Sequence, residues 1–233
     1  MFLNNRIHQP EQLDDFKLDG PILYQSLREL QRINHLFGNV RTLSQAVMAQ
    51  LGPFRGKEVT IIDLGCGSGD VLAAIAKKAR KQQQAVQLIG MDANPNSLAF
   101  AKKCWAAYPE LSFLQTDIMS PLFQLPPCDL LLSSHFIYHF EDEALQQFLQ
   151  KQLRAVRYAA IFSELDRHFL ALHLFKFVSL LLRFSPMTRR DGQTAIKRAF
   201  KQAELKKIIQ TLALSKMDLQ YKWAFRHLLT IYP

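Results

Sequence analysis

The sequence predicts an α/β fold in which a mostly parallel sheet is covered by helices on both faces. Between residues 59 and 163, short apolar runs rich in β-branched residues alternate with longer segments of helical periodicity. These runs are continuously apolar, which is typical of parallel strands buried on both sides. With 233 residues and 48% hydrophobic content, the chain can bury one sizeable core, so we expect one domain with elaborations.

Two helices are expected before the first strand, because apolar residues between Leu23 and Leu51 recur at helical spacing. Gly38-Asn39 separates them, and Gly52-Pro53 ends the second. The strands expected next are Val59–Asp63, Val86–Met91, Leu111–Gln115, Leu130–Ser133 and Ala159–Ser163. The helices expected between them are Val71–Lys81, Asn96–Ala107 and Glu141–Val156.

After Glu164 the alternation is interrupted by an apolar helix, Phe169–Leu182, with Pro186 beyond its end. This helix is too short to span a bilayer. A polar stretch, Thr188–Thr194, is expected to lead into the last elements. These are a helix over Lys201–Leu214 and two strands, Leu219–Trp223 and Leu228–Tyr232.

The charge of the chain is unevenly distributed. The net charge is +9, and residues 151–233 hold 16 Lys and Arg against 5 Asp and Glu.

The first twelve residues lack the basic start and apolar run of a secretory signal, so we expect a cytoplasmic protein. Cys66, Cys104 and Cys128 fit neither a disulfide framework nor a zinc site, so we expect no bound metal.

The most informative segment is the glycine-rich turn after the first strand, Asp63-Leu-Gly65-Cys-Gly67-Ser-Gly69. Glycines let a ligand approach the main chain at the carboxyl end of the sheet, where open α/β folds bind ligands. The dinucleotide fingerprint would require glycine at the position of Asp70. A pyrophosphate would also face the carboxylates of Asp63 and Asp70, whereas S-adenosylmethionine (SAM) carries a cationic sulfonium and amino group. The turn therefore favours SAM.

Acidic residues follow at the next two strand ends. Asp92 can hold both hydroxyls of a ribose, and Asp117 can accept the exocyclic amine of adenine. Four ordered motifs resemble those of the class I SAM-dependent methyltransferases: Asp63–Gly69, Gly90-Met91-Asp92, Thr116-Asp117-Ile118 and Cys128–Ser133.

That resemblance implies a Rossmann-like open sandwich with a seven-stranded, mostly parallel sheet and an antiparallel last strand. We expect a helical extension over residues 1–57 and a methyltransferase domain over 58–233, with a helical insertion that contains a lid helix at about 166–195. The cofactor-binding residues it implies are Gly65, Gly67 and Gly69 for methionine, Asp92 for ribose, Asp117 and Ile118 for adenine, and Ser133 beside the methionine tail. Asp63 and Ala93 are also expected to bind the cofactor.

The segment after the fourth strand faces the transferred methyl group in this fold. It lacks the Asn/Asp-Pro-Pro-Tyr/Phe sequence of base-amino methyltransferases, which argues against DNA as substrate. His135 is the first candidate for a general base, because a neutral imidazole can take a hydroxyl proton near neutral pH. His139 is the second, with capping or packing as its alternative role. Candidate substrate contacts are Phe136, His168 and Asp191.

Further short motifs resemble a bacterial subgroup found beside polyketide or phenolic-lipid enzymes. They are Leu30–Gly38, Ser163–His168, Arg189–Gly192, Ile196–Phe200, Trp223, Phe225 and Arg226. The resemblance implies O-methylation of a small or medium apolar or aromatic acceptor in secondary-metabolite or lipid biosynthesis, by a monomer or homodimer.

Several alternatives stay open. The helix Phe169–Leu182 can be a lid, a core or dimer helix, or a peripheral membrane contact flanked by basic residues. Carbon methylation, RNA methylation driven by the basic C-terminal third, a non-catalytic SAM-fold subunit and a dinucleotide-binding protein are the competing functions.

Overall fold

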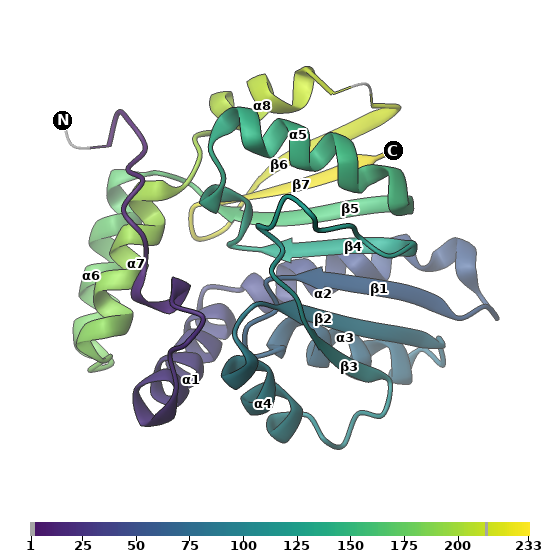
Figure 1. The fold of residues 1–233 in the computed structure, drawn as a ribbon, viewed down its shortest axis with the longest axis horizontal. Helices are drawn as coiled ribbons and strands as arrows, with labels where there is room; N and C mark the ends of the chain where they lie inside the picture. Colours follow the sequence, from purple (N-terminus) through teal and green to yellow (C-terminus); the bar gives the residue numbers. More distant parts are fainter. Residues whose placement is uncertain (1–2, 213) are drawn as a thin grey trace.

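The computed structural model describes residues 3–212 and 214–233, which fold around one seven-stranded sheet (Figure 1). The strand order is β3-β2-β1-β4-β5-β7-β6, and β7 runs antiparallel to both of its neighbours. The strands are β1 (Val59–Leu64), β2 (Val86–Asp92), β3 (Leu111–Gln115), β4 (Cys128–Ser134), β5 (Val156–Leu165), β6 (Lys216–Lys222) and β7 (Arg226–Tyr232). The predicted mostly parallel sheet with an antiparallel last strand is confirmed.

Eight α-helices are present in the described part of the chain. They are α1 (Gly20–Leu36), α2 (Asn39–Gln50), α3 (Asp70–Lys81), α4 (Pro95–Cys104), α5 (Asp142–Gln152), α6 (Phe169–Leu181), α7 (Pro186–Arg198) and α8 (Gln202–Gln210). Among the described residues, none of these helices combines the length and the hydropathy needed to cross a bilayer.

The two faces of the sheet bury separate apolar clusters, because successive residues of a strand point to opposite sides. Ile61 and Leu130 pack with residues of α2 and α3, whereas their neighbours Ile62 and Leu131 pack with residues of α5 and α8. Figure 1 shows α2 and α3 behind the sheet, and α5 and α8 on its other side. This burial on both faces explains the continuous apolar runs in the sequence.

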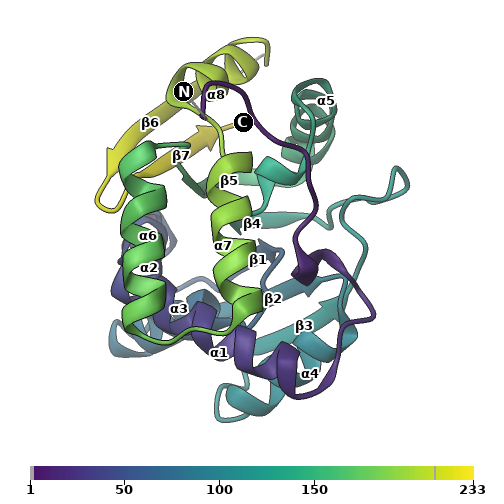
Figure 2. The ribbon, with the colours of Figure 1, turned by 90° about the vertical axis from the view of Figure 1, so that its left-hand side faces the viewer.

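A third group of elements lies where the parallel strands end. Figures 1 and 2 show the N-terminal segment, α1, α6 and α7 together at this side of the molecule. Ile33 of α1, Phe175 of α6 and Ile196 of α7 belong to one apolar cluster. These elements therefore form a cap over the carboxyl ends of the strands.

One expected element is wrong: the polar stretch Thr188–Thr194 is not a connection but the centre of α7. Ser185 caps this helix, since its side chain accepts a hydrogen bond from the Thr188 N–H at 3.2 Å. Pro186 occupies the first turn, where its missing N–H costs nothing. Pro186 thus lies beyond the end of α6, as expected, and also begins the next helix.

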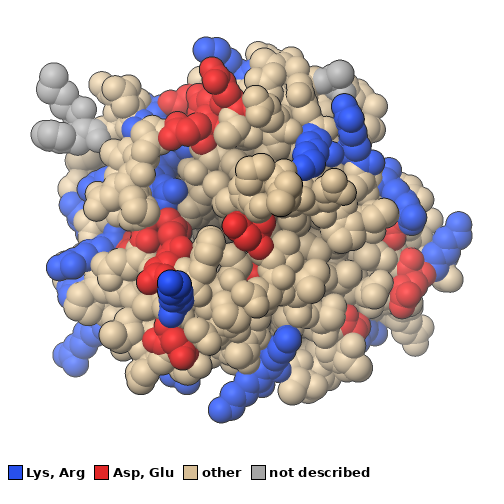
Figure 3. Space-filling model, in the orientation of Figure 1, with Lys and Arg blue, Asp and Glu red and all other residues tan. Residues whose placement is uncertain are grey.

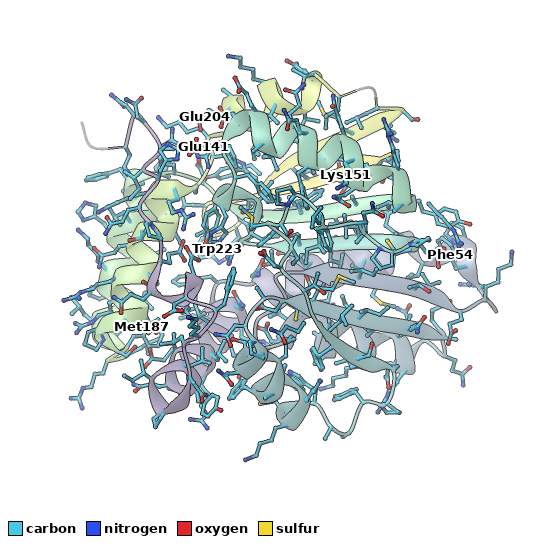
Figure 4. All side chains as sticks on the ribbon, in the orientation of Figure 1. Phe54, Glu141, Lys151, Met187, Glu204 and Trp223 are labelled. Carbon is cyan, nitrogen blue, oxygen red and sulfur yellow. The ribbon has the colours of Figure 1, made fainter. Side chains whose placement is uncertain are left out.

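Two arginines anchor the N-terminal segment to the rest of the fold. Arg167 is buried and donates to the Leu3 and Asn4 carbonyls, both at 3.0 Å, while it pairs with Glu204 at 2.6 Å. Arg6 pairs with Asp142 at 2.7 Å. Figure 4 places Glu204 and the neighbouring Glu141 beside this segment. Long-range ion pairs therefore fix residues that carry no regular structure.

Candidate functional site

A cavity of about 460 Å³ opens at the carboxyl ends of the parallel strands, beneath the cap. Most of the residues singled out from the sequence line it: Asp63, Gly65, Gly67, Asp92, Ala93, Asp117, Ile118, His135, Phe136, His139 and Asp191. Gly69, Ser133 and His168 are not among the lining residues. The fold thus brings together side chains from strand ends that lie far apart in the sequence.

The glycine-rich turn forms one wall of the cavity. Gly65 and Gly67 have φ values of +70° and +49°, a region that other residues rarely adopt. A Cβ atom on Gly67 would meet no atom within 4 Å. The Gly67 N–H donates to Asp92 Oδ2 at 2.9 Å, so the turn and the end of β2 support each other. The turn therefore leaves open space for a ligand next to the main chain.

Three carboxyl groups surround this turn. Burial, together with the nearby Asp70 and Asp92 carboxyl groups, raises the pKa of Asp63 to about 8. Burial also raises the pKa of Asp70 and of Asp92. The Asn34 amide of α1 donates to Asp70 Oδ2 at 3.1 Å, which covers the site from the cap side. A cation placed among these groups would relieve their repulsion, whereas an anion would increase it.

Ser133 and Gly69 support the site from behind rather than lining it. The Ser133 hydroxyl is buried and donates to the Leu64 carbonyl at 3.2 Å, so Ser134 is the serine of β4 that lines the cavity. A Cβ atom on Gly69 would lie 2.9 Å from the Phe113 ring. Ser133 and Gly69 do not line the cavity, and their direct contact with a ligand stays a prediction.

His135 lines the cavity, but its ring is engaged by Arg226, whose Nη1 lies against His135 Nε2. Burial and the Arg226 charge hold the pKa of His135 well below its usual range. A nitrogen that faces a guanidinium cannot easily take another proton. The arrangement argues against His135 as the general base and favours a role in positioning Arg226.

Arg226 and Glu164 are both buried, and the charge of each affects the pKa of the other. Burial lowers the pKa of Arg226 to about 10 and raises that of Glu164 to about 7, so the guanidinium keeps its charge at neutral pH. The Phe136 and Ile137 N–H groups donate to Glu164 Oε1 at 3.1 and 3.2 Å. Within the described residues, Arg226 Nε and Glu164 Oε2 have no hydrogen-bond partner. Arg226 therefore offers a fixed positive charge to the cavity.

A second polar cluster joins the N-terminal segment to the loop after β4. Asp14 Oδ1 lies 3.5 Å from His139 Nδ1, and Arg198 Nη1 donates to Glu11 at 3.1 Å and to Asp14 at 2.9 Å. Burial raises the pKa of Glu11 to about 8 and lowers that of His139 to about 4. Glu11 and Asp14 escaped the sequence analysis because nothing local connects them to His139.

Oxygen and nitrogen atoms of Glu11, Asp14 and His139 lie within 4.8 Å of one another, a spacing at which a metal ion could be held. Arg198 already pairs with both acids, and the raised pKa of Glu11 leaves Asp14 as the main negative charge at neutral pH. The cluster is thus arranged as an arginine-carboxylate network, in which Asp14 orients the imidazole of His139.

The other end of the cavity is apolar and is built by the cap. Its apolar lining residues are Leu27, Leu30, Ile33, Phe37, Leu165, Ala171, Leu174, Phe175, Ala195, Ile196 and Phe225. Asp191 lies in this wall, but its two oxygens accept the Gln12 and Leu13 N–H groups at 2.9 and 3.0 Å. His168 stacks on Phe225 and caps α6 by accepting the Leu170 N–H at 3.1 Å. Of the three expected substrate contacts, Asp191 and His168 therefore have structural roles, and Phe136 lines the cavity.

Comparison with known proteins identifies a methyltransferase domain and the fold of the chain. Residues 61–158 match a family model described as a methyltransferase domain, and no curated protein matches the chain in sequence. The plantazolicin methyltransferase BpumL, solved with S-adenosylhomocysteine (SAH) and a triazolic desmethylPZN analog, is 15% identical with a TM-score of 0.62. The match covers 91% of this chain and 94% of BpumL.

Two further solved structures have the same fold. The magnesium protoporphyrin IX methyltransferase of Synechocystis, solved with SAM, is 14% identical with a TM-score of 0.56, and the match covers 94% of this chain and 88% of that one. Human N-acetylserotonin methyltransferase, also with SAM, is 15% identical with a TM-score of 0.62, over 90% of this chain and 55% of that one.

Other similar structures are longer. This chain spans 61% of a Nostoc punctiforme protein assigned as an O-methyltransferase, 46% of the citrinin polyketide synthase CMeT domain and 66% of a Bordetella parapertussis protein. At 13 to 16% identity these similarities establish the fold.

Proposed function

We propose that this chain, which has the class I methyltransferase fold and a methyltransferase domain over residues 61–158, transfers the methyl group of SAM to an apolar acceptor. The acceptor is of small or medium size, and the methylated atom is an oxygen, in secondary-metabolite or lipid biosynthesis. The observation that carries the proposal is that one cavity joins a carboxylate-lined turn to an apolar wall.

In this proposal residues 58–233 are the methyltransferase domain, and residues 1–57 with the insertion at about 166–195 close the acceptor end. SAM, when bound, supplies an electrophilic methyl group on a sulfonium. Asp63, Asp70 and Asp92 are carboxyl groups whose ionised forms suit a sulfonium and an ammonium. Asp117 and Ile118 line the cavity where they would reach the adenine.

Methyl transfer to oxygen requires a positioned acceptor and the loss of its proton. His139 is the proposed base, since Asp14 holds its Nδ1 side and leaves the other nitrogen for the acceptor. With a pKa of about 4, His139 is neutral at pH 7 but weakly basic. The Arg226 charge favours an acceptor oxyanion. Together these groups suit an acidic oxygen, such as that of a phenol, an enol or a carboxyl group.

Calorimetric titration with SAM, SAH and NADH tests the ligand assignment. Because a bound cation favours the ionised form of Asp63, the affinity for SAM should rise with pH up to about 8 and then level off. Below about pH 8, the affinity for SAM should increase by about tenfold for each pH unit. Asp63→Asn keeps the shape of the side chain and should abolish the dependence. Binding of NADH alone would overturn the proposal in favour of a dinucleotide-binding protein.

A turnover assay and an RNA-binding measurement separate the remaining alternatives. Binding of SAH without turnover on any phenolic or carboxylic acceptor would point to a non-catalytic subunit. Association with RNA that weakens steeply with salt would favour the RNA methyltransferase instead, because each phosphate contact releases counterions. We expect neither result.

A further inference from the structure

The outward side of α6 is apolar and uncovered. Five large residues on this side, which we call the α6 outer face, are 55 to 66% exposed: Phe169, Leu170, Phe177, Leu180 and Leu181. At about 100° per residue they fall within roughly one third of the helix circumference. They therefore form a single stripe rather than scattered contacts with solvent.

This concentration is unusual within the molecule. Of the fifteen large apolar residues that are 40% or more exposed in the described part of the chain, six lie between residues 169 and 182. Single exposed apolar residues are ordinary on a folded protein, but a contiguous patch marks an interaction surface. Figure 2 shows α6 in front, next to α7, with no other described element over its outer side.

The charges around the stripe are basic. Arg183 and Arg190 are exposed, and Lys176 and Arg189 are half-buried. The one acid of α7, Asp191, is buried and bound to the N-terminal segment. Lys and Arg side chains project along the left margin of Figure 3, the side on which Figure 1 places α6 and α7. An apolar stripe with a basic rim complements an anionic lipid surface.

The same charges disfavour a second copy of the chain as the occupant. In a two-fold dimer formed through the α6 outer face, this face of one copy would contact the same face of the other copy, because two-fold contacts are self-complementary. Arg183 and Arg190 would then approach the same residues of the other copy. Like charges brought together in this way weaken the contact.

The inner side of α6 faces the acceptor end of the cavity. Ala171, Leu174 and Phe175 line the cavity, while Phe169 and Phe177 of the same helix point outward. We propose that the α6 outer face lies in the interface of an anionic bilayer, and that the acceptor is a bilayer-borne molecule that enters beneath this helix. The second part rests on the proposed function, whereas the docking itself does not.

Vesicle flotation of the full chain tests the docking. Phosphatidylcholine vesicles with about one third phosphatidylglycerol should bind the protein more tightly than pure phosphatidylcholine, and high salt should weaken the difference. The double variant Phe177→Ser/Leu181→Ser should bind the anionic vesicles more than about tenfold less tightly. Arg183→Glu/Arg190→Glu should lose the preference for anionic vesicles.

Leu114→Ser/Leu122→Ser is the matched control. Leu114 belongs to β3, and Leu122 follows Pro121, whose carbonyl accepts a hydrogen bond from Lys151 of α5. Both side chains are exposed and apolar and neither belongs to the cap, so this variant should bind vesicles like the wild type. All variants should keep the SAH affinity of the wild type, which shows that they are folded. Wild-type protein that binds SAH but not anionic vesicles overturns the docking and leaves the methyltransferase proposal intact.

Failure to bind SAM or SAH, with vesicle binding retained, would instead overturn the proposed function. Light scattering tests whether a second copy of the chain covers the α6 outer face instead. A wild-type dimer that Phe177→Ser/Leu181→Ser converts to a monomer would identify the α6 outer face as a contact between copies and overturn the docking.

Discussion

Gly192 allows α7 to pack closely against α6, and its replacement by alanine should disturb the acceptor end of the cavity. A Cβ atom on Gly192 would lie 2.2 Å from Cζ and 2.6 Å from Cε1 of Phe175. Carbon atoms in ordinary contact are about 3.5 to 4.0 Å apart, so the ring tip must move by roughly 1.3 to 1.8 Å. Phe175 is buried and lines the cavity, and therefore the movement narrows the apolar end.

Two opposing effects determine how much Gly192→Ala changes the free energy of unfolding. Overpacking of a buried site costs about 1 to 3 kcal/mol, whereas alanine in a helix interior is more favourable than glycine by about 1 kcal/mol. The net loss in free energy of unfolding is then about 1 kcal/mol, or about 2 to 4 °C in Tm for a chain of this length. In a Phe175→Leu background, which shortens the obstructing side chain, Gly192→Ala should no longer destabilise.

The assay is a double-mutant cycle of thermal or urea unfolding on Gly192→Ala, Phe175→Leu and the combined variant. The cycle should give a coupling energy of about 1 kcal/mol or more. Gly52→Ala is the control, since a Cβ atom there meets nothing within 4 Å. SAH affinity should not change, because the carboxylate-lined end is untouched. A coupling energy near zero would refute the proposed contact between Gly192 and Phe175.

Two more predictions concern stability. The pKa of Glu11 in the folded chain, about 8, lies above its ordinary value, so the folded state holds a proton that the unfolded state releases, and stability should fall as the pH rises from about 5 to 8. Glu11→Gln should flatten that slope in melting curves; an unchanged slope would contradict the burial argument. Arg167→Met removes both hydrogen bonds from Arg167 to Glu204 and the donor of three carbonyls, and it should lower the free energy of unfolding by about 2 to 4 kcal/mol. Arg157→Met, which removes an exposed partner of Asp129, should cost less than about 1 kcal/mol in the same urea titration.

The cofactor end of the site was accessible to sequence analysis because its signals are local. The strands are short and mostly apolar, and Asp63, Asp92 and Asp117 lie within two residues of the ends of β1, β2 and β3. Parallel strands place such ends at one edge of the sheet, so spacing along the chain becomes proximity in space. Ser133 shows the limit of this argument, because the alternation of strand side chains turned its neighbour, Ser134, toward the cavity instead.

The acceptor end depends on contacts that local patterns do not reveal. The run Arg189-Arg190-Asp191-Gly192 is polar and contains a helix breaker, yet it is helical because Met187, Ala195 and Ile196 bury one side of α7. Ser185-Pro186 was an available signal for the start of that helix. Glu11 and Asp14 reach His139 only through the tertiary path of the N-terminal segment, and the Arg226 contact with His135 joins two distant strands.

The sequence of α6 does not decide whether this helix is a lid or a membrane contact. A helix that is apolar on nearly all sides is compatible with either role, and its periodicity does not separate them. The structure assigns the sides separately: Ala171 and Phe175 face the cavity, whereas Phe169 and Phe177 face outward beside a basic rim. Lid and membrane contact then cease to be alternatives. A helix that covers the acceptor end and also lies in a bilayer would let an apolar acceptor pass from lipid to cavity without crossing water, which removes the cost of exposing its apolar surface.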